Sequence, residues 1–123
     1  MQIVRATQRR TSTTPNATMT TLASPSLGSA ESSLWLVDMP AGIRGPEHSF
    51  AGEVLWSLTA GSGTVRVDGV DHPLEAGDTV VIPAGELRQF TAGSTGFSGV
   101  VTVREGEAFL GDGSSAGVPP WVA

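Results

Sequence analysis

A chain of 123 residues has the size of a single domain with its own hydrophobic core, and its 39% hydrophobic and 15% charged residues are ordinary for a globular protein. The formal net charge of -5, with seven largely scattered basic residues that are all Arg, excludes nucleic acid and anionic membrane as main partners, because both favour clustered basic residues. The absence of Cys excludes disulfides, thiolate metal sites and Cys nucleophiles.

The first third of the chain predicts an arm followed by two strands. Residues 2–5 have the pattern of a short strand, and the polar run 7–16, with Pro15 and five Thr or Ser residues, indicates an extended arm or loop. Residues 17–23 are rich in β-branched side chains and predict a strand. Residues 34–39 are apolar at both odd and even positions, which predicts a strand that is covered on both faces.

Short strands separated by Gly-rich turns are expected in the rest of the chain. The pattern predicts strands at 54–59, 64–68, 72–75, 79–82, 88–92 and 97–104, of which 72–75 is an edge piece and 79–82 is buried. Tight turns are expected at 60–63, 68–69 and 92–96. Residues 105–110 fit one helical turn, and 111–117 have the composition of a flexible tail. Many short strands with Gly and Pro turns predict an all-β sandwich or barrel.

Two sequence motifs in the middle of the chain resemble those of the cupins, which are small jelly-roll β-barrels. The second cupin motif is matched by Gly77-Asp78 and, after a spacer, by Ile82-Pro83-Ala84-Gly85, and the first is recognisable as Gly42, His48-Ser49-Phe50 and Gly61. The resemblance implies an all-β cupin jelly-roll barrel, or double-stranded β-helix, forming one domain over 1–123. We expect an N-terminal arm or edge strand at 1–16, the barrel at 17–110 and a tail at 111–123.

The resemblance also implies where a metal ion would be bound, because metal-binding cupins use two His and one Glu of the first motif and one His of the second. The four matching positions hold His48, Phe50, Val54 and Arg88, of which only His48 can ligate a cation. Glu53 lies one position early, so strand alternation turns it outward unless a bulge turns it back. The expected cofactor is none, and the alternative is one divalent transition metal on His48 and Glu53.

Alternation predicts that Arg88 and His48 both face the barrel interior. A buried Arg is unfavourable unless it is paired or solvated, and two interpretations are open. In the first, Arg88 is structural and either forms an ion pair with an acidic residue (Glu47, Glu53 or Glu86) or extends its charged end to solvent at the barrel mouth. In the second, it binds a carboxylate, enolate or other oxyanion of a small ligand. His48 is correspondingly either a hydrogen-bonded core residue or an acid/base. The remaining substrate-binding candidates are Trp35, Phe50, Glu53, Trp56 and Phe90.

These residues, together with the resemblance, predict a small-molecule-binding cupin of bacterial secondary metabolism. In the favoured interpretation it is a metal-independent enzyme of isomerase, cyclase or lyase type, with Arg88 as the anion anchor and His48 as the acid/base. One alternative is a non-catalytic binding, sensing or structural cupin. The other is a metal-dependent cupin with the altered ligand set of His48 and Glu53.

The expected partner is a small organic ligand, anionic in the favoured interpretation, and neither nucleic acid nor a membrane is expected. The resemblance implies a homodimer formed through sheet edges, to which the apolar terminal segments could contribute. The N-terminus lacks the apolar stretch of a signal peptide, and no apolar run reaches the roughly 20 residues of a membrane span, so a cytoplasmic protein is expected.

Overall fold

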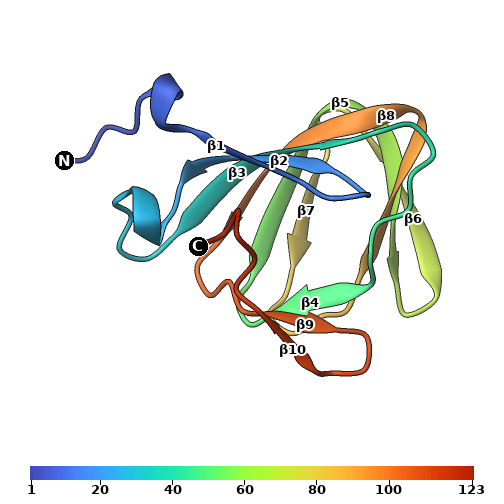
Figure 1. The fold of residues 1–123 in the computed structure, drawn as a ribbon. Coiled ribbons are helices and arrows are strands. Elements are labelled where there is room, and N and C mark those ends of the chain that lie inside the picture. The colour runs from blue at the N-terminus through green and yellow to red at the C-terminus, as the bar shows by residue number, and fades with distance from the viewer.

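The computed structural model describes all 123 residues. Its strands form two antiparallel sheets that enclose one core (Figure 1). The seven-stranded sheet has the order β1-β2-β3-β8-β5-β6, with β7 also paired to β5, and the three-stranded sheet has the order β10-β9-β4. The elements are η1 (Ala6–Gln8), β1 (Arg10–Thr13), β2 (Thr18–Ala23), η2 (Pro25–Leu27), β3 (Ser33–Met39), β4 (His48–Phe50), β5 (Val54–Val67), β6 (Val70–Glu75), β7 (Thr79–Ile82), β8 (Gln89–Val103), β9 (Ala108–Leu110) and β10 (Ser115–Gly117). The predicted all-β jelly-roll fold is confirmed.

The two central strands, β5 and β8, are longer than the sequence predicts. Turns were expected at 60–63 and 92–96, but both segments continue as strand, and β5 and β8 pair from Val54–Val103 to Arg66–Gln89, although residues 93–96 have no partner on β5. The register shifts between Leu58 and Ala60 and between Gly61 and Gly63, so bulges bend the strands without ending them. Gly61 and Gly96 both have a positive φ, which the bend requires and which Gly adopts without a steric penalty.

The outer faces of β3 and β7 are less covered than predicted. In β3, Trp35, Val37 and Met39 point into the core while Leu34 is exposed, so the prediction of a strand covered on both faces is wrong. In β7 only Ile82 is buried, and Val81 remains 58% exposed. Both strands therefore have one apolar inner face and an outer face that is also rich in aliphatic side chains.

The two ends of the chain both add strands to the fold. Residues 2–5 form no strand, whereas Arg10–Thr13 within the polar run pairs with β2 as the edge strand of the larger sheet. The predicted helical turn at 105–110 is wrong, because Ala108–Leu110 is strand β9 and pairs with β4. Part of the expected flexible tail, Ser115–Gly117, pairs with β9.

The Asp-Gly turn signal at 68–69 is confirmed. Asp68 and Gly69, with φ values of 51° and 76°, form the two-residue turn between β5 and β6, as the Asp-Gly pair predicts. The Asp78 carboxylate accepts a hydrogen bond from the Glu75 backbone N–H at 2.7 Å, which closes its own turn. The structure contains no helix with the length and apolarity that crossing a bilayer requires.

Aromatic side chains from both sheets meet in the core. The Trp56 ring stacks on Phe90 with ring centroids 4.8 Å apart and meets the edge of Phe97 at 5.1 Å. Trp35 from β3 meets Phe50 from β4 edge to face at 6.2 Å. Of these contacts, the one between Trp35 and Phe50 joins the two sheets, and a cavity remains beside the rings.

Candidate functional site

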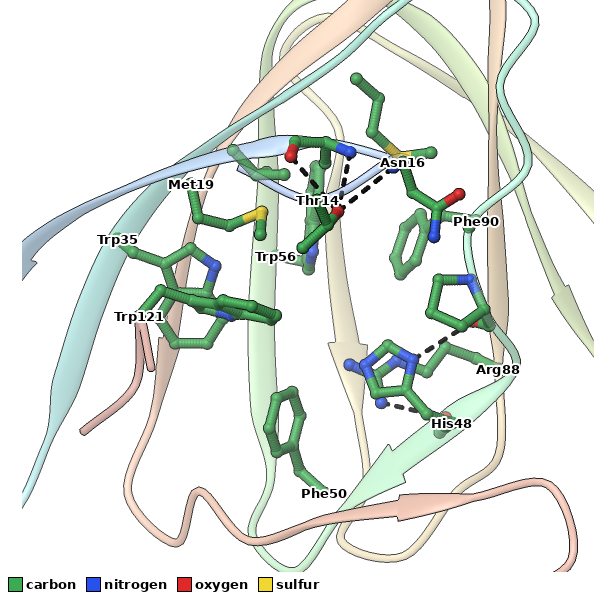
Figure 2. Close-up of a pocket in the computed structure, with 15 residues that line it drawn as sticks. Thr14, Asn16, Met19, Trp35, His48, Phe50, Trp56, Arg88, Phe90 and Trp121 are labelled. Carbon is green, nitrogen blue, oxygen red and sulfur yellow. Dashed lines mark hydrogen bonds between the residues drawn. The ribbon is translucent and has the colours of Figure 1, made fainter. Parts of the chain in front are cut away.

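A cavity of about 170 Å³ lies between the two sheets (Figure 2). Its wall comes from the β1–β2 hairpin, β3, the loop before β4, β4, β5, the start of β8 and the segment near Trp121. A cavity of roughly 150 Å³ lined by apolar side chains is large enough for benzene. The space therefore suits a ligand built around one ring or a similarly small organic group.

The backbone places His48 and Arg88 directly opposite each other in this cavity. The His48 N–H donates to the Arg88 carbonyl and the Arg88 N–H donates to the His48 carbonyl, both at 3.0 Å. Residues that exchange both backbone hydrogen bonds in an antiparallel pair project their side chains on the same face, side by side. Both side chains line the cavity, as Figure 2 shows, so both face the interior as strand alternation predicts.

The Arg88 side chain is only 2% exposed and has no carboxylate partner. One terminal nitrogen donates to the His48 carbonyl at 3.1 Å, the guanidinium carbon lies 5.0 Å from the Phe50 ring centroid, and the buried Nε has no hydrogen-bond partner. The interpretation of Arg88 as a structural ion pair with an acidic residue is therefore wrong. Burial lowers the pKa of Arg88 to about 10, so the side chain remains a cation at neutral pH.

His48 is half-buried and neutral at physiological pH. Its Nδ1 lies 3.2 Å from the Pro46 carbonyl oxygen, and because a carbonyl only accepts, Nδ1 carries the proton and Nε2 keeps a free lone pair. Burial, and secondly the positive charge of Arg88, lower the pKa of His48 to about 4, although the hydrogen bond to Pro46 opposes this shift. His48 is thus a proton acceptor beside a fixed positive charge.

The four aromatic candidates, Trp35, Phe50, Trp56 and Phe90, all line the cavity and also belong to the core. Their rings form the apolar wall around the His48 and Arg88 pair (Figure 2). The wall around the pair is therefore mainly apolar.

The structure does not bring Glu53 to the cavity. Val54 is 1% exposed and points into the core, so its neighbour Glu53 points outward, as strand alternation requires. Glu53 is exposed and lines a separate surface pocket with Leu55 and Arg104. Glu53 is thus neither a wall residue of the cavity nor a neighbour of His48.

The residues present do not fit the divalent metal that the resemblance implies. The four positions discussed above hold one imidazole, the buried apolar side chains of Phe50 and Val54, and the cation Arg88. Nowhere in the structure do three His, Cys, Asp or Glu side chains gather closely enough to bind one ion. Arg88 moreover repels a cation from the place where a fourth ligand would be needed.

The sequence interpretation missed a second group of wall residues. Thr14, Asn16 and Met19 reach the cavity from the β1–β2 hairpin, and Trp121 covers it from the chain segment after β10. The Thr14-Pro15-Asn16 sequence between two runs of β-branched residues is the turn signal that could have identified the hairpin.

Trp121 packs on the body of the protein. Its carbonyl accepts a hydrogen bond from the Thr21 hydroxyl at 2.8 Å, and the Ser33 hydroxyl donates to the carbonyl of the next residue, Val122. Val122 is buried in the core. Hydroxyl groups of β2 and β3 therefore fix the part of the cavity wall that Trp121 forms.

Comparisons with known proteins agree with this architecture. The family model of the Cupin domain matches residues 35–96. Three similar solved structures are the polyketide cyclase RemF from Streptomyces resistomycificus, the DMSP lyase DddQ from Ruegeria pomeroyi DSS-3 and KdgF from Halomonas sp.. Their identities are 19%, 20% and 14%, and their TM-scores are 0.73, 0.75 and 0.71.

The matches cover most of this chain. The aligned regions cover 85%, 86% and 85% of this chain in the comparisons with RemF, DddQ and KdgF, respectively. They cover 79%, 62% and 94% of those three chains in the same order. A sequence comparison with curated proteins finds no match. At these identities the structural similarity shows the shared fold, and it does not show the reaction.

Proposed function

The chain belongs to the Cupin domain family, and from that premise we propose that it is a metal-independent cupin that binds a small organic anion and transfers a proton within it. Arg88 anchors an anionic or carbonyl oxygen of the ligand, and His48 accepts the proton. The apolar side chains around the pair hold the body of the ligand. The reaction class is isomerisation or cyclisation.

The observation that carries this proposal is the unpaired guanidinium of Arg88 in an apolar cavity. A buried cation without an anionic partner is energetically unfavourable, and a ligand oxyanion supplies the missing partner. Its remaining N–H groups offer the planar donor arrangement that suits a carboxylate or enolate. The cavity thus favours ligands with a negative charge or with one that develops during reaction.

The proposed reaction uses the free lone pair of His48. Nε2 takes a proton from the carbon next to a carbonyl group, and the electron pair of the C–H bond moves to the carbonyl oxygen, which becomes an enolate stabilised by Arg88. Where a C=C bond is conjugated to the carbonyl, the imidazolium returns the proton to the γ carbon of the resulting dienolate and the double bond shifts, which gives an isomer. Attack of the α carbon of the enolate on a second carbonyl of the same ligand gives a ring instead, and the imidazolium protonates the alkoxide that this attack forms. No oxidant or reductant is consumed.

The named relatives support this class of chemistry. RemF is a polyketide cyclase and DddQ is a DMSP lyase, so proteins of the same fold carry out cyclisation and lyase reactions on small molecules. RemF, from a Streptomyces species, also supports a role in bacterial secondary metabolism.

Binding is tested with benzoate, which has one ring and one carboxylate. Arg88→Met keeps most of the side-chain volume and removes the charge, and Arg66→Met is the matched control because Arg66 is exposed on β5. Calorimetry should show that wild type and R66M bind benzoate and that R88M binds it roughly 10- to 100-fold more weakly, as expected for a hydrogen bond to a charged group. Equal affinity in R88M, or no binding by wild type, would contradict the anion site.

Proton transfer is tested separately with phenylpyruvate, whose benzylic carbon exchanges its protons through an enol. Wild type in D₂O should accelerate deuterium incorporation, measured by NMR, and His48→Gln should abolish the acceleration while retaining benzoate binding.

A non-catalytic binding or sensing role is the second candidate, and it is favoured by the presence of only one imidazole in the cavity. Benzoate binding without any acceleration of exchange would support this role over catalysis.

A further inference from the structure

The turn at the tip of the β1–β2 hairpin is closed by Thr14 alone. The Thr14 hydroxyl accepts hydrogen bonds from the backbone N–H groups of Asn16 and Ala17, both at 3.2 Å, and lies 3.3 Å from the Ala17 carbonyl, to which it can donate. The Thr14 N–H donates to the same carbonyl at 2.9 Å. In many turns an Asn side chain caps the local backbone, but here the Thr hydroxyl fills that role.

As a result, the side-chain amide of Asn16 is left free at the cavity. Asn16 lines the cavity and is half-buried, and its amide makes no hydrogen bond to any other group of the protein. Figure 2 shows this amide extending from the hairpin beside the Phe90 ring, with His48 and Arg88 below them. The cavity therefore has polar groups at two places, with Asn16 on the hairpin and the His48 and Arg88 pair where β4 meets the start of β8.

We propose that Asn16 is a specificity-determining residue that recognises a second polar group of the ligand, away from the oxygen bound by Arg88. This inference rests on the proposed anion site. A carboxamide offers both a donor and an acceptor, so it can satisfy a hydroxyl, a carbonyl or an amide of the ligand. The substrate class is accordingly a small ring-containing organic anion with a polar substituent opposite the anionic group.

The free amide also explains how the cavity would reject close analogues. A site built to hydrogen-bond a ligand hydroxyl discriminates strongly against an analogue that lacks it, because the polar group of the protein is then left unpaired. An apolar wall alone distinguishes ligands of equal size weakly. Asn16 therefore selects by hydrogen bonding, whereas the aromatic side chains select by size.

The test compares three acids: benzoate, 4-hydroxybenzoate and 4-methylbenzoate. The last two have nearly the same size, but only one carries a hydrogen-bonding group opposite the carboxylate. Calorimetry should show that wild type prefers 4-hydroxybenzoate over 4-methylbenzoate by roughly five- to tenfold, which is the effect of one good hydrogen bond. Asn16→Ala and Asn16→Ser should reduce the preference to near unity while leaving the affinity for benzoate nearly unchanged.

Thr11→Ala is the matched control, because Thr11 lies on the same hairpin and is exposed outside the cavity. This variant should keep the full preference for 4-hydroxybenzoate. The role of Asn16 is overturned if both Asn16 variants keep the preference for 4-hydroxybenzoate. It is also overturned if wild type binds benzoate but shows no such preference. In either case the proposed anion site still stands. If wild type binds none of the three acids, the proposed anion site fails, and this inference fails with it.

Discussion

The protein should lose stability on mild acidification because of a single side chain, His48. Its pKa is lowered in the folded state from the usual 6.5 to about 4, so between these values the unfolded chain binds a proton that the folded chain does not. Acid therefore favours the unfolded state in this range, and stability falls as pH decreases from 6.5 towards 4. Replacing His48 with Gln removes this dependence and leaves a neutral side chain that can still donate to the Pro46 carbonyl.

The expected size of the effect follows from the two pKa values. Each pH unit of separation corresponds to about 1.4 kcal/mol, which sets an upper limit of about 3 kcal/mol below pH 4. At pH 5 the folded protein is mainly unprotonated at His48 and the unfolded chain is mainly protonated, and the loss relative to neutral pH is about 2 kcal/mol. At pH 7 the contribution of this group is close to zero.

Urea unfolding between pH 4.5 and pH 7 measures the effect, since the midpoint and slope give the free energy of unfolding at each pH. Wild type should lose about 2 kcal/mol more than H48Q between pH 7 and pH 5. His72, the other histidine, is exposed on β6, so H72Q is the matched control and should follow wild type. Parallel curves for wild type and H48Q would refute the argument that burial and Arg88 hold His48 neutral.

Two further predictions concern the cavity wall and the assembly. A side chain at Gly99 would overlap the Trp56 ring and lie 2.8 Å from the Ser57 carbonyl oxygen. Gly99→Ala should therefore destabilise the fold by roughly 1–3 kcal/mol, measured by urea unfolding. It should also weaken benzoate binding, measured by calorimetry. Gly111→Ala, which meets only the side chain of Glu47, should change neither quantity. The homodimer expected from the sequence remains a prediction, and light scattering at micromolar concentration should give twice the chain mass of 12.6 kDa. A single-chain mass for the wild type would exclude the dimer.

The fold could be predicted from the sequence because its turn motifs are local. The Gly77-Asp78 and Pro83-Ala84-Gly85 segments and the Asp68-Gly69 turn depend on backbone conformations that a few neighbouring residues determine. The family match over 35–96 confirms the resemblance that these motifs suggested.

The continuity of β5 and β8 could not be predicted in the same way. The Gly and Ser residues at 60–63 and 92–96 look like turns when each segment is considered alone. In the structure Gly63 pairs with Ala92, and a side chain at Gly63 would lie 2.6 Å from the Thr91 carbonyl oxygen and 2.7 Å from the Phe97 ring. Gly63 is thus required for close packing between strands distant in sequence, which no local pattern reveals.

The candidate site was predicted where strand alternation determines it. Alternation correctly placed His48 and Arg88 on the inner face and Glu53 on the outer one. The contribution of the hairpin and of Trp121 depends instead on how distant segments fold over the barrel. The lack of a carboxylate near Arg88 is also a property of the three-dimensional arrangement, because three Glu residues were close enough in the sequence to be plausible partners.

The reciprocal backbone hydrogen bonds between His48 and Arg88 have a consequence for how this barrel could change during evolution or design. The positions of the two residues depend on main-chain atoms, which every amino acid except Pro supplies in full. Substituting either residue therefore changes the charge, basicity or ligating capacity inside the barrel. The new side chain is still attached at the same backbone position. Single substitutions at these two positions can therefore change the chemistry inside the barrel while the backbone stays the same.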